Sequence, residues 1–219
     1  MFTGIIEHLG TISRLEINSA GGKLTAHAPT LAPKLAVSGS VAVNGCCLTV
    51  VHRNEESFSA DLSNETLAKT SFALLKTGAR VNLEQPLTAG QEFGGHFVLA
   101  HVDGTGQVAH LSSAGDSWNF GVVVPSELAR YVVSKGSITI DGISLTVAGW
   151  YVRRQFSLAE IAVIPYTYQH TNIADRVAGD PVNLEADILG KYIERYAARR
   201  DSAATGSALR VEDLIRQGF

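Results

Sequence analysis

The chain has 219 residues, of which 45% are hydrophobic and 18% charged, and its formal net charge is −3. At roughly 100–200 residues per domain, this length fits one large domain or two small ones. The apolar share excludes a disordered chain. With 18 basic against 21 acidic residues, there is no electrostatic reason to expect nucleic acid or an anionic membrane as partner.

The two cysteines, Cys46 and Cys47, are neighbours in the chain. Adjacent Cα atoms lie ~3.8 Å apart, below the ~4.4–6.8 Å that disulfides usually need, so we expect free thiols. Free thiols indicate a reducing compartment, the cytoplasm. The chain begins without the basic start and apolar core of a secretory signal. No apolar run approaches the ~20 residues of a membrane-spanning helix.

Short β-prone runs separated by turn residues follow one another along most of the chain. In chain order, the expected strands cover residues 5–12, 24–28, 41–43, 48–51, 57–62, 98–102, 106–110, 119–124, 138–140, 145–147 and 156–163. Asn44-Gly45 and Asp141-Gly142 are strong hairpin-turn signals. Short helices are expected near residues 68–75 and 126–133. This pattern predicts an all-β fold, with a small barrel or sandwich in each half.

An internal repeat divides the chain into those halves. Residues 39–51 read GSVAVNGCCLTVV and residues 136–148 read GSITIDGISLTVA, with six of 13 positions identical. Residues 81–84 reappear as residues 182–185, and the opening residues 3–5 are aligned with residues 100–102, which sets Gly4 opposite His101. The repeat predicts two domains, residues 1–96 and 97–186, followed by a tail, residues 187–219.

The tail has a different periodicity. Its apolar positions follow helical spacing and form one stripe, Ile188, Leu189, Tyr192, Ile193 and Tyr196. A second amphipathic stretch runs through Leu209, Val211, Leu214 and Ile215. The helix lies outside both repeats, so its stripe is expected to pack either on its own chain or against another subunit.

The repeated motif places small reactive side chains at matching positions. Cys47 in the first half corresponds to Ser144 in the second, and Thr49 and Thr146 lie two residues further on, hence on the same strand face. These are either ordinary strand residues or the lining of two related pockets. His101 is either a general base near pH 7 or an unpaired surface histidine, whereas we expect a structural role for His96.

Other chemistry has no support in the sequence. Zinc-ligand spacing and the common nucleotide and hydrolase motifs are absent. Residue patterns alone therefore predict two similar, not quite equivalent, small-molecule pockets.

Several motifs together resemble the riboflavin synthase family over residues 1 to about 200. They are the opening Met1-Phe2-Thr3-Gly4-Ile5-Ile6-Glu7, the runs Asn44-Gly45-Cys46-Cys47-Leu48-Thr49-Val50 and Gly94-Gly95-His96, then His101-Val102-Asp103-Gly104, Lys135-Gly136-Ser137-Ile138, Asp141-Gly142-Ile143-Ser144-Leu145-Thr146-Val147, Val182-Asn183-Leu184-Glu185-Ala186-Asp187 and Lys191-Tyr192.

The resemblance implies two tandem six-stranded Greek-key β-barrels, a C-terminal helix that drives homotrimer formation, and neither cofactor nor metal. The implied reaction is the dismutation of two 6,7-dimethyl-8-ribityllumazine molecules. A four-carbon unit passes between them, giving riboflavin and 5-amino-6-(ribitylamino)uracil. The active site is implied to lie between the first barrel of one subunit and the second barrel of its neighbour.

The resemblance also implies which residues bind the two lumazines. The first pocket is expected to use Gly4, Ile5, Ile6, Cys47, Leu48, Thr49, Asp61, Leu62, Ser63, Asn64, Glu65 and Thr66. The second is expected to use Ala100, His101, Val102, Lys135, Ser144, Leu145, Thr146, Ala162, Val163, Ile164, Pro165, Tyr166 and Thr167. Weaker candidates are Phe2, Asp141 and Asp187.

For the chemistry, we expect His101, assisted by Thr146 or Ser144, to remove a proton from the C7 methyl group of one lumazine. Cys47 is expected to position or activate the attacking group in the other pocket. Two positions depart from the family pattern: Ala100 stands where many relatives have Gly, and Tyr166 stands where many have His.

Two rival classes of protein compete with the enzyme. A non-catalytic lumazine- or flavin-binding relative, serving as an antenna or carrier, typically loses the motifs of the second barrel. Here that half keeps Lys135, His101, Ser144 and Thr146. A flavin-dependent reductase needs a nicotinamide-binding domain, for which no residues remain.

Overall fold

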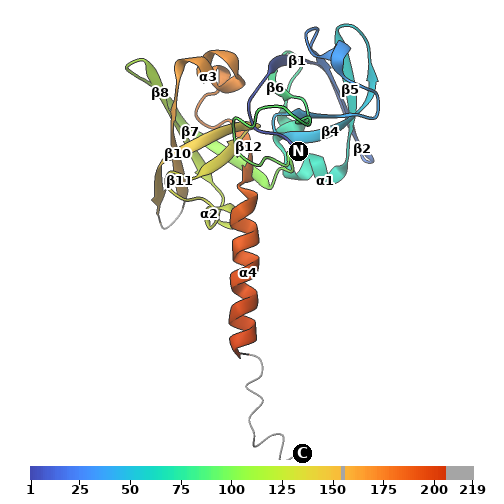
Figure 1. The fold of residues 1–219 in the computed structure, drawn as a ribbon. Coiled ribbons are helices and arrows are strands. Elements are labelled where there is room, and N and C mark those ends of the chain that lie inside the picture. Colours follow the sequence, from blue (N-terminus) through green and yellow to red (C-terminus); the bar gives the residue numbers. More distant parts are fainter. Residues whose placement is uncertain (154–155, 206–219) are drawn as a thin grey trace, which may run out of the picture. The chain divides into compact units, whose positions relative to one another are not determined.

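The strands form two closed six-stranded antiparallel barrels in the computed structural model, which describes residues 1–153 and 156–205 (Figure 1). The first barrel consists of β1 (His8–Asn18), β2 (Gly21–His27), β3 (Ser40–Val43), β4 (Cys46–Arg53), β5 (Ser57–Leu62) and β6 (Arg80–Glu84). The second consists of β7 (Gly104–Ala114), β8 (Ser117–Val124), β9 (Ser137–Ile140), β10 (Ile143–Val152), β11 (Ser157–Val163) and β12 (Pro181–Ala186).

Both barrels have the same Greek-key topology. In the first, the meander β3–β4–β5 is flanked by β2, which lies beside β5, so the neighbours run β2-β5-β4-β3. In the second, the equivalent order is β8-β11-β10-β9. The prediction of two tandem six-stranded barrels is confirmed.

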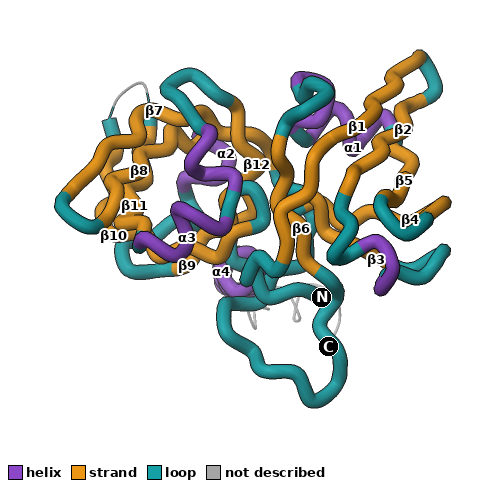
Figure 2. The backbone as a smooth tube through the Cα atoms, turned by 90° about the horizontal axis from the view of Figure 1, so that it is seen from above, coloured by secondary structure: helices purple, strands orange, loops and turns teal. Residues whose placement is uncertain are grey.

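Short helices connect the strands (Figure 2). They are η1 (Ala32–Lys34), α1 (Asn64–Lys69), η2 (Ser71–Leu74), α2 (Ser126–Ala129), α3 (Pro165–His170) and η3 (Asn172–Asp175), where η marks a 3₁₀ helix. The helix expected over residues 68–75 is thus two separate pieces, and that over residues 126–133 is only one turn.

One predicted strand is wrong. Residues 98–102 make only an isolated bridge, from Val98 to Phe2. The reason is Ala100, whose φ of 57° is left-handed and interrupts an extended run.

Alternation along the strands separates the cores from the site. On β4, Leu48 and Val50 are buried in the first barrel, whereas Cys47 and Thr49 lie on the outer face. On β10, Leu145 and Val147 are buried in the second barrel, and Thr146 is exposed. The candidate chemistry therefore lies on the outer surface of each barrel, on a strand fixed by its inner face.

The two hairpin turns predicted from the sequence also join the barrels. Asn44-Gly45 and Asp141-Gly142 all have positive φ, as a type I′ turn requires. A Cβ on Gly45 would lie 2.6 Å from the backbone nitrogen of Gly142, and a Cβ on Gly142 would lie 2.6 Å from that of Gly45. Only glycine permits this approach at both positions.

The tail forms the helix α4 (Ile188–Thr205), which belongs to a separate unit from residues 1–187. Its apolar positions are strongly exposed: Leu189, Tyr192, Ile193 and Tyr196. The second amphipathic stretch, Leu209 to Ile215, lies outside the described residues. Within the described part of the chain, no helix has both the length and the apolar character needed to cross a bilayer.

Candidate active site

The segments that precede the two barrels pair with each other. Phe2 donates its backbone N–H to the carbonyl of Val98 (2.8 Å), and Val98 donates to the carbonyl of Phe2 (3.3 Å). Phe2 and Val98 are both buried, together with Ala42 and Ala100. This pairing brings residues about 96 positions apart in the sequence into one small cluster.

Each of these segments contacts the motif strand of the other repeat's barrel. The backbone N–H of Ser144 on β10 donates to the carbonyl of Gly4 (2.8 Å), and that of Cys47 on β4 donates to the carbonyl of Ala100 (2.7 Å). The exchange continues into the cores, since Ile6 packs on the second barrel and Val102 on the first. The prediction had placed Gly4 and Ile6 at the first barrel, and Ala100 and Val102 at the second. Within one chain, the structure places them the other way round.

The same contacts correct the repeat alignment by one residue. Gly4 (φ 76°) corresponds to Ala100 (φ 57°), because both accept from the motif strand in a left-handed conformation. Two buried glutamates support this register: Glu84 accepts from the backbone N–H of Thr3 (2.7 Å), and Glu185 accepts from that of Leu99 (2.8 Å).

The partner of His101 in the repeat is therefore Ile5, not Gly4. The two segments still differ, because one presents an imidazole where the other presents a branched alkyl group.

Glu84 holds the N-terminal segment in place. Its two carboxylate oxygens accept from Thr3 N–H, Thr3 O–H (2.8 Å) and Gly4 N–H (3.0 Å). Burial raises the pKa of Glu84, and the bonds from Thr3 and Gly4 oppose that rise.

A cavity of about 450 Å³ lies against the outer face of the first barrel. It is lined by Cys47, Leu48, Thr49, Val51, Asp61, Leu62, Ser63 and Thr66. Seven of these eight were predicted as site residues, so the structure brings together most of the first predicted set. Asn64 and Glu65 lie in the first turn of α1, where Ser63 caps the helix by accepting from Thr66 N–H (3.0 Å).

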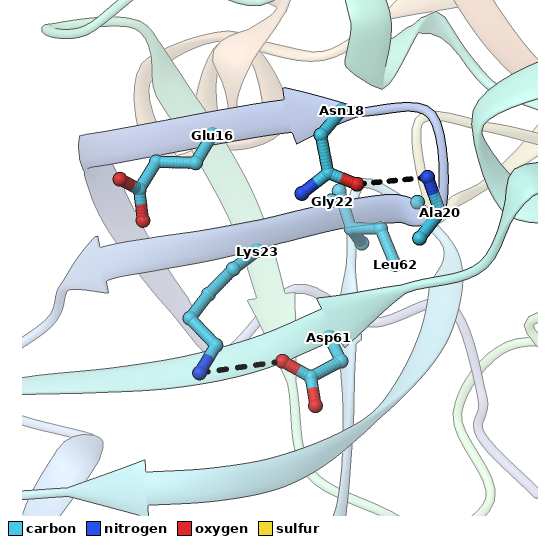
Figure 3. Close-up of a pocket in the computed structure, with 8 residues that line it drawn as sticks. Glu16, Asn18, Ala20, Gly22, Lys23, Asp61 and Leu62 are labelled. Carbon is cyan, nitrogen blue, oxygen red and sulfur yellow. Dashed lines mark hydrogen bonds and ion pairs between the residues drawn. The ribbon is translucent and has the colours of Figure 1, made fainter.

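A polar hollow of about 530 Å³ adjoins this cavity and shares Asp61 and Leu62 with it (Figure 3). Lys23 approaches Asp61 at 3.5 Å across the paired strands β2 and β5. In the second barrel, the same cross-strand pair is Asn119 and Ala162. The first site thus has a charged rim at positions where the second is neutral.

The two cysteines have opposite environments. Cys46 is buried in the first core, and burial raises the pKa of its thiol to about 12. Cys47 is only partly buried and lines the cavity. Cys47 is therefore the thiol available to a ligand.

The second motif strand carries a contact that sequence reasoning missed. The imidazole Nδ1 of His96 lies 2.7 Å from Oγ of Ser144, and its Nε2 lies 3.1 Å from Oγ1 of Thr139. Burial lowers the pKa of His96. The sequence signal for this contact was the glycine pair that precedes His96. In the structure, a Cβ on Gly95 would lie 1.9 Å from the carbonyl oxygen of Thr3, so the backbone before His96 is tightly packed.

His101 has a different setting from the one expected of a held base. His101 is exposed, and within the described part of the chain its imidazole makes no side-chain hydrogen bond. It follows Ala100, whose carbonyl binds Cys47, so it lies near the first motif strand rather than beside Ser144.

The remaining predicted residues of the second set lie on β10, β11 and α3 or close to these elements. Lys135 has a φ of 66° and donates its backbone N–H to Val147 (2.7 Å). Ile164 precedes α3, which begins at Pro165 and includes Tyr166 and Thr167. The ring of Tyr166 stacks on His170, with centroids 4.0 Å apart. Tyr166 thus fills the position of the family's histidine with a phenol that pairs within its own helix.

Neither of the weaker candidates Phe2 and Asp141 has access to a ligand. Phe2 plugs the cluster between the two segments. Asp141 is buried in the hairpin turn, where it binds Arg176 (2.6 Å) and the backbone N–H of Asn183 (2.8 Å). Within the described residues, no group of three or more His, Cys, Asp or Glu is arranged to hold a metal ion.

Solved structures share this arrangement of barrels. A crystal structure of LumP complexed with 6,7-dimethyl-8-(1'-D-ribityl) lumazine superposes with a TM-score of 0.74 at 22% identity, covering 85% of this chain and 99% of that one. The LumP complex with riboflavin gives 0.76 at 23% identity, with the same coverage. At this level of identity, the likeness establishes the fold.

Sequence comparison is more specific. The family model of the lumazine binding domain matches twice, over residues 3–86 and 99–187, in the register that the backbone contacts show. The riboflavin synthase of Actinobacillus pleuropneumoniae is 39% identical over 219 residues, which is 100% of both chains. That of Bacillus subtilis (strain 168) is 35% identical over 223 residues, again 100% of both. The chain belongs to the riboflavin synthase family.

Proposed function

We propose that this protein is a riboflavin synthase, an enzyme that dismutates two molecules of 6,7-dimethyl-8-ribityllumazine into riboflavin and 5-amino-6-(ribitylamino)uracil. The observation that carries the proposal is the duplicated site. Cys47 and Thr49 lie on the outer face of β4, and Ser144 and Thr146 lie on the outer face of the equivalent strand β10. Full-length relatives of this name support it. A reaction that consumes two copies of one molecule suits a chain with two related pockets.

The two pockets differ in the way that a dismutation requires, since one lumazine gives up the four-carbon unit and the other receives it. Cys47 faces a cavity backed by the apolar cluster of Phe2 and Ala42. Ser144 lies in a polar setting beside His96. Holding two flat heterocycles in contact turns a bimolecular step into a local one.

In this proposal, Cys47, Ser144, Thr146 and His101 are the catalytic residues, and the remaining members of the two predicted sets bind substrate. Asp61, Ser63 and Thr66 provide hydroxyl and carboxylate groups for the ribityl chain of the first lumazine. The hydroxyl of Thr167 and the ammonium of Lys135 serve the second.

We further propose that the active protein is a cytoplasmic homotrimer whose site forms between the first barrel of one subunit and the second barrel of the next. The exposed apolar stripe of α4 supports self-association, because an 18-residue helix with four large exposed apolar side chains needs a partner surface in water. In the same reading, residues 1–96, 97–186 and 187–219 are the two barrel domains and the oligomerisation tail.

The second candidate is a non-catalytic lumazine-binding protein. The fold it shares with LumP favours it. Against it stands the second barrel, in which Lys135, Ser144 and Thr146 are present and Ser144 is held by a histidine.

Incubation of the purified protein with 6,7-dimethyl-8-ribityllumazine, followed by riboflavin absorbance, separates the two candidates. The enzyme forms riboflavin with many turnovers per site. Tight binding without turnover would establish the carrier instead. His101→Ala is expected to slow turnover far more than it weakens lumazine binding, and an equal loss of both would remove its catalytic role.

A further inference from the structure

Three side chains form a continuous hydrogen-bonded chain on the outer face of the second barrel, from a partly exposed end at Ser144 to a buried end at Thr139. Oγ of Ser144 is 2.7 Å from Nδ1 of His96, and Nε2 of His96 is 3.1 Å from Oγ1 of Thr139. Ser144 on β10 and Thr139 on β9 are directly paired in the sheet, and the imidazole bridges them. Thr139 and His96 are buried, and Ser144 is partly exposed, so only one end of the chain is open to a ligand.

The first barrel has no equivalent of this chain. There Cys47 is paired with Ala42, which occupies the position of Thr139 and has no polar side-chain atom. Ala42 packs instead with Phe2, Val98 and Ala100. The duplicated strands are thus equivalent in backbone, but only the second has its small nucleophilic group bonded to a histidine.

The surroundings of His96 favour the neutral imidazole. Burial lowers its pKa, and Asp187 is the charged group that acts in the opposite direction. The imidazole faces the hydroxyls of Thr139 and Ser144, and the backbone N–H of His96 donates to the carbonyl of Thr3 (3.1 Å). Glu84 accepts from the backbone N–H and the hydroxyl of Thr3. A neutral imidazole with one acceptor nitrogen toward Ser144 is able to take a proton.

We propose that His96 is a positioning residue that acts through Ser144, and that the lumazine in the second barrel is the one that loses its C7-methyl proton. The hydroxyl of Thr139 accepts from Nε2–H, which leaves Nδ1 to accept from the hydroxyl of Ser144. As the C–H bond of the methyl group breaks, Oγ of Ser144, rather than His101, takes that proton and passes its own to Nδ1.

This step conserves atoms and charge. The electron pair of the broken C–H bond stays on the lumazine as a delocalised carbanion, and the imidazole becomes imidazolium. The proton returns by the same route when the ring system is later protonated. The inference rests on the proposed function and adds to it the roles of the barrels: the second-barrel lumazine is the carbanion, and its partner at Cys47 is the acceptor.

Two readouts on four variants test the relay. Riboflavin formation gives kcat and KM across pH, and proton NMR in D₂O gives the rate at which the C7-methyl protons of bound lumazine exchange. The variants are His96→Gln, Ser144→Ala, the double variant and Thr139→Val, with the exposed His27→Gln as the matched control. Lumazine fluorescence provides the dissociation constant for each, and circular dichroism verifies the fold.

Because general-base assistance contributes about 10²–10⁴-fold, we expect His96→Gln to lower kcat and methyl exchange together by about 100-fold. Its lumazine affinity should stay within about twofold, and the acid limb of its pH–rate profile should be lost. Thr139→Val, which frees the tautomer without removing the imidazole, should show a smaller loss of the same kind. The double variant should be no slower than Ser144→Ala alone, since both residues serve one step.

The relay is refuted if His96→Gln exchanges methyl protons as fast as the unmodified protein, or if its kcat falls while the pH profile is unchanged. It is also refuted if the two single losses multiply in the double variant. An unmodified protein that exchanges methyl protons through His96 without forming riboflavin would overturn the proposed function and leave the relay standing.

Discussion

The residues that distinguish the two sites occupy matching backbone positions. Cys47 and Ser144 each donate a backbone N–H to the carbonyl of a left-handed residue, Ala100 or Gly4. The shared backbone fixes where each side chain points, and the side chain sets its chemistry. A duplicated fold can in this way provide two binding sites of one shape with different reactivity.

Cys47 and Cys46 should differ sharply toward alkylating reagents. The thiolate is the reactive form, and burial raises the pKa of Cys46 to about 12, whereas Cys47 lines an open cavity. At pH 8, iodoacetamide should label Cys47 alone, as tandem mass spectrometry of the peptide will show. Bound lumazine should protect it. Labelling of Cys46 at a similar rate would contradict the burial of that side chain.

Gly4 and Ala100 allow a matched test of the crossed segments. A methyl group at Gly4 would lie 2.7 Å from Cβ of Ser144 at a φ of 76°. We expect Gly4→Ala to destabilise the fold by about 1–3 kcal/mol and to slow turnover by displacing Ser144.

The converse change, Ala100→Gly, relieves the backbone strain of a left-handed alanine (φ 57°) but removes one buried methyl group. The first effect is worth about 1 kcal/mol and the second about 0.8 kcal/mol, so the free energy of unfolding should barely change. Urea unfolding of both variants checks the pair. Equal destabilisation by the two changes would show that the left-handed conformation is not what matters at these positions.

Among the elements, the hairpins were predictable and the crossing segments were not. The dipeptides Asn44-Gly45 and Asp141-Gly142 predict their turns through local backbone preference. The alternation of buried and exposed residues along β4 and β10 identifies the outward faces. The contacts of Gly4 with Ser144 and of Ala100 with Cys47 join residues far apart in the sequence. No local pattern encodes these contacts. The structure was therefore needed to correct the repeat alignment by one residue and to show that each segment contacts the other repeat's barrel.

The site shows the same division between local and distant information. For the first cavity, the strand motif singled out Cys47 and Thr49, and the family resemblance implied Leu48, Asp61, Leu62, Ser63 and Thr66. The sequence predicts only a structural role for His96, which follows Gly94-Gly95; its partners, Thr139 and Ser144, come from two later strands and are not visible in any local pattern.

A buried ion pair between elements of the second repeat provides a stability test. Asp141 in the β9–β10 turn binds Arg176, which follows η3; the side chain of Asp141 is buried, and that of Arg176 is 14% exposed. The first repeat has Asn44 and Leu75 at these positions. Asp141→Asn leaves the guanidinium without its carboxylate and should cost about 3–5 kcal/mol in the free energy of unfolding.

The double variant Asp141→Asn with Arg176→Leu copies the first repeat and should recover most of that loss. Its denaturant midpoint should therefore lie closer to the unmodified protein than to the single variant. Additive losses would indicate that the two repeats do not share one packing solution at this turn.

At the scale of the whole molecule, the barrels and the tail have separate tasks. Both apolar cores lie within residues 1–187, whereas α4 presents exposed Tyr192, Ile193 and Tyr196. Removing residues 188–219 should leave the β-rich circular dichroism spectrum and its melting transition largely intact. We expect the truncated chain to be a monomer by light scattering, with little activity, and a fully active monomer would refute the site between subunits.

Mixing two inactive variants tests that site directly. Cys47→Ser impairs the first motif strand and Ser144→Ala impairs the second, so neither homo-oligomer contains an intact pair. If the site joins the first barrel of one subunit to the second barrel of another, co-expressed chains form some interfaces with Cys47 from the Ser144→Ala chain and Ser144 from the Cys47→Ser chain. Activity should then rise several-fold above that of either variant alone.

The control for this experiment is each variant mixed with itself under the same conditions, together with a chain that carries both substitutions. The doubly substituted chain should rescue neither partner, because it contributes no intact strand. If the site were formed within one chain, the mixed oligomers would be as inactive as their parents, since every chain would lack either Cys47 or Ser144. Restored riboflavin formation would show that one catalytic unit takes its two lumazine pockets from two copies of the protein.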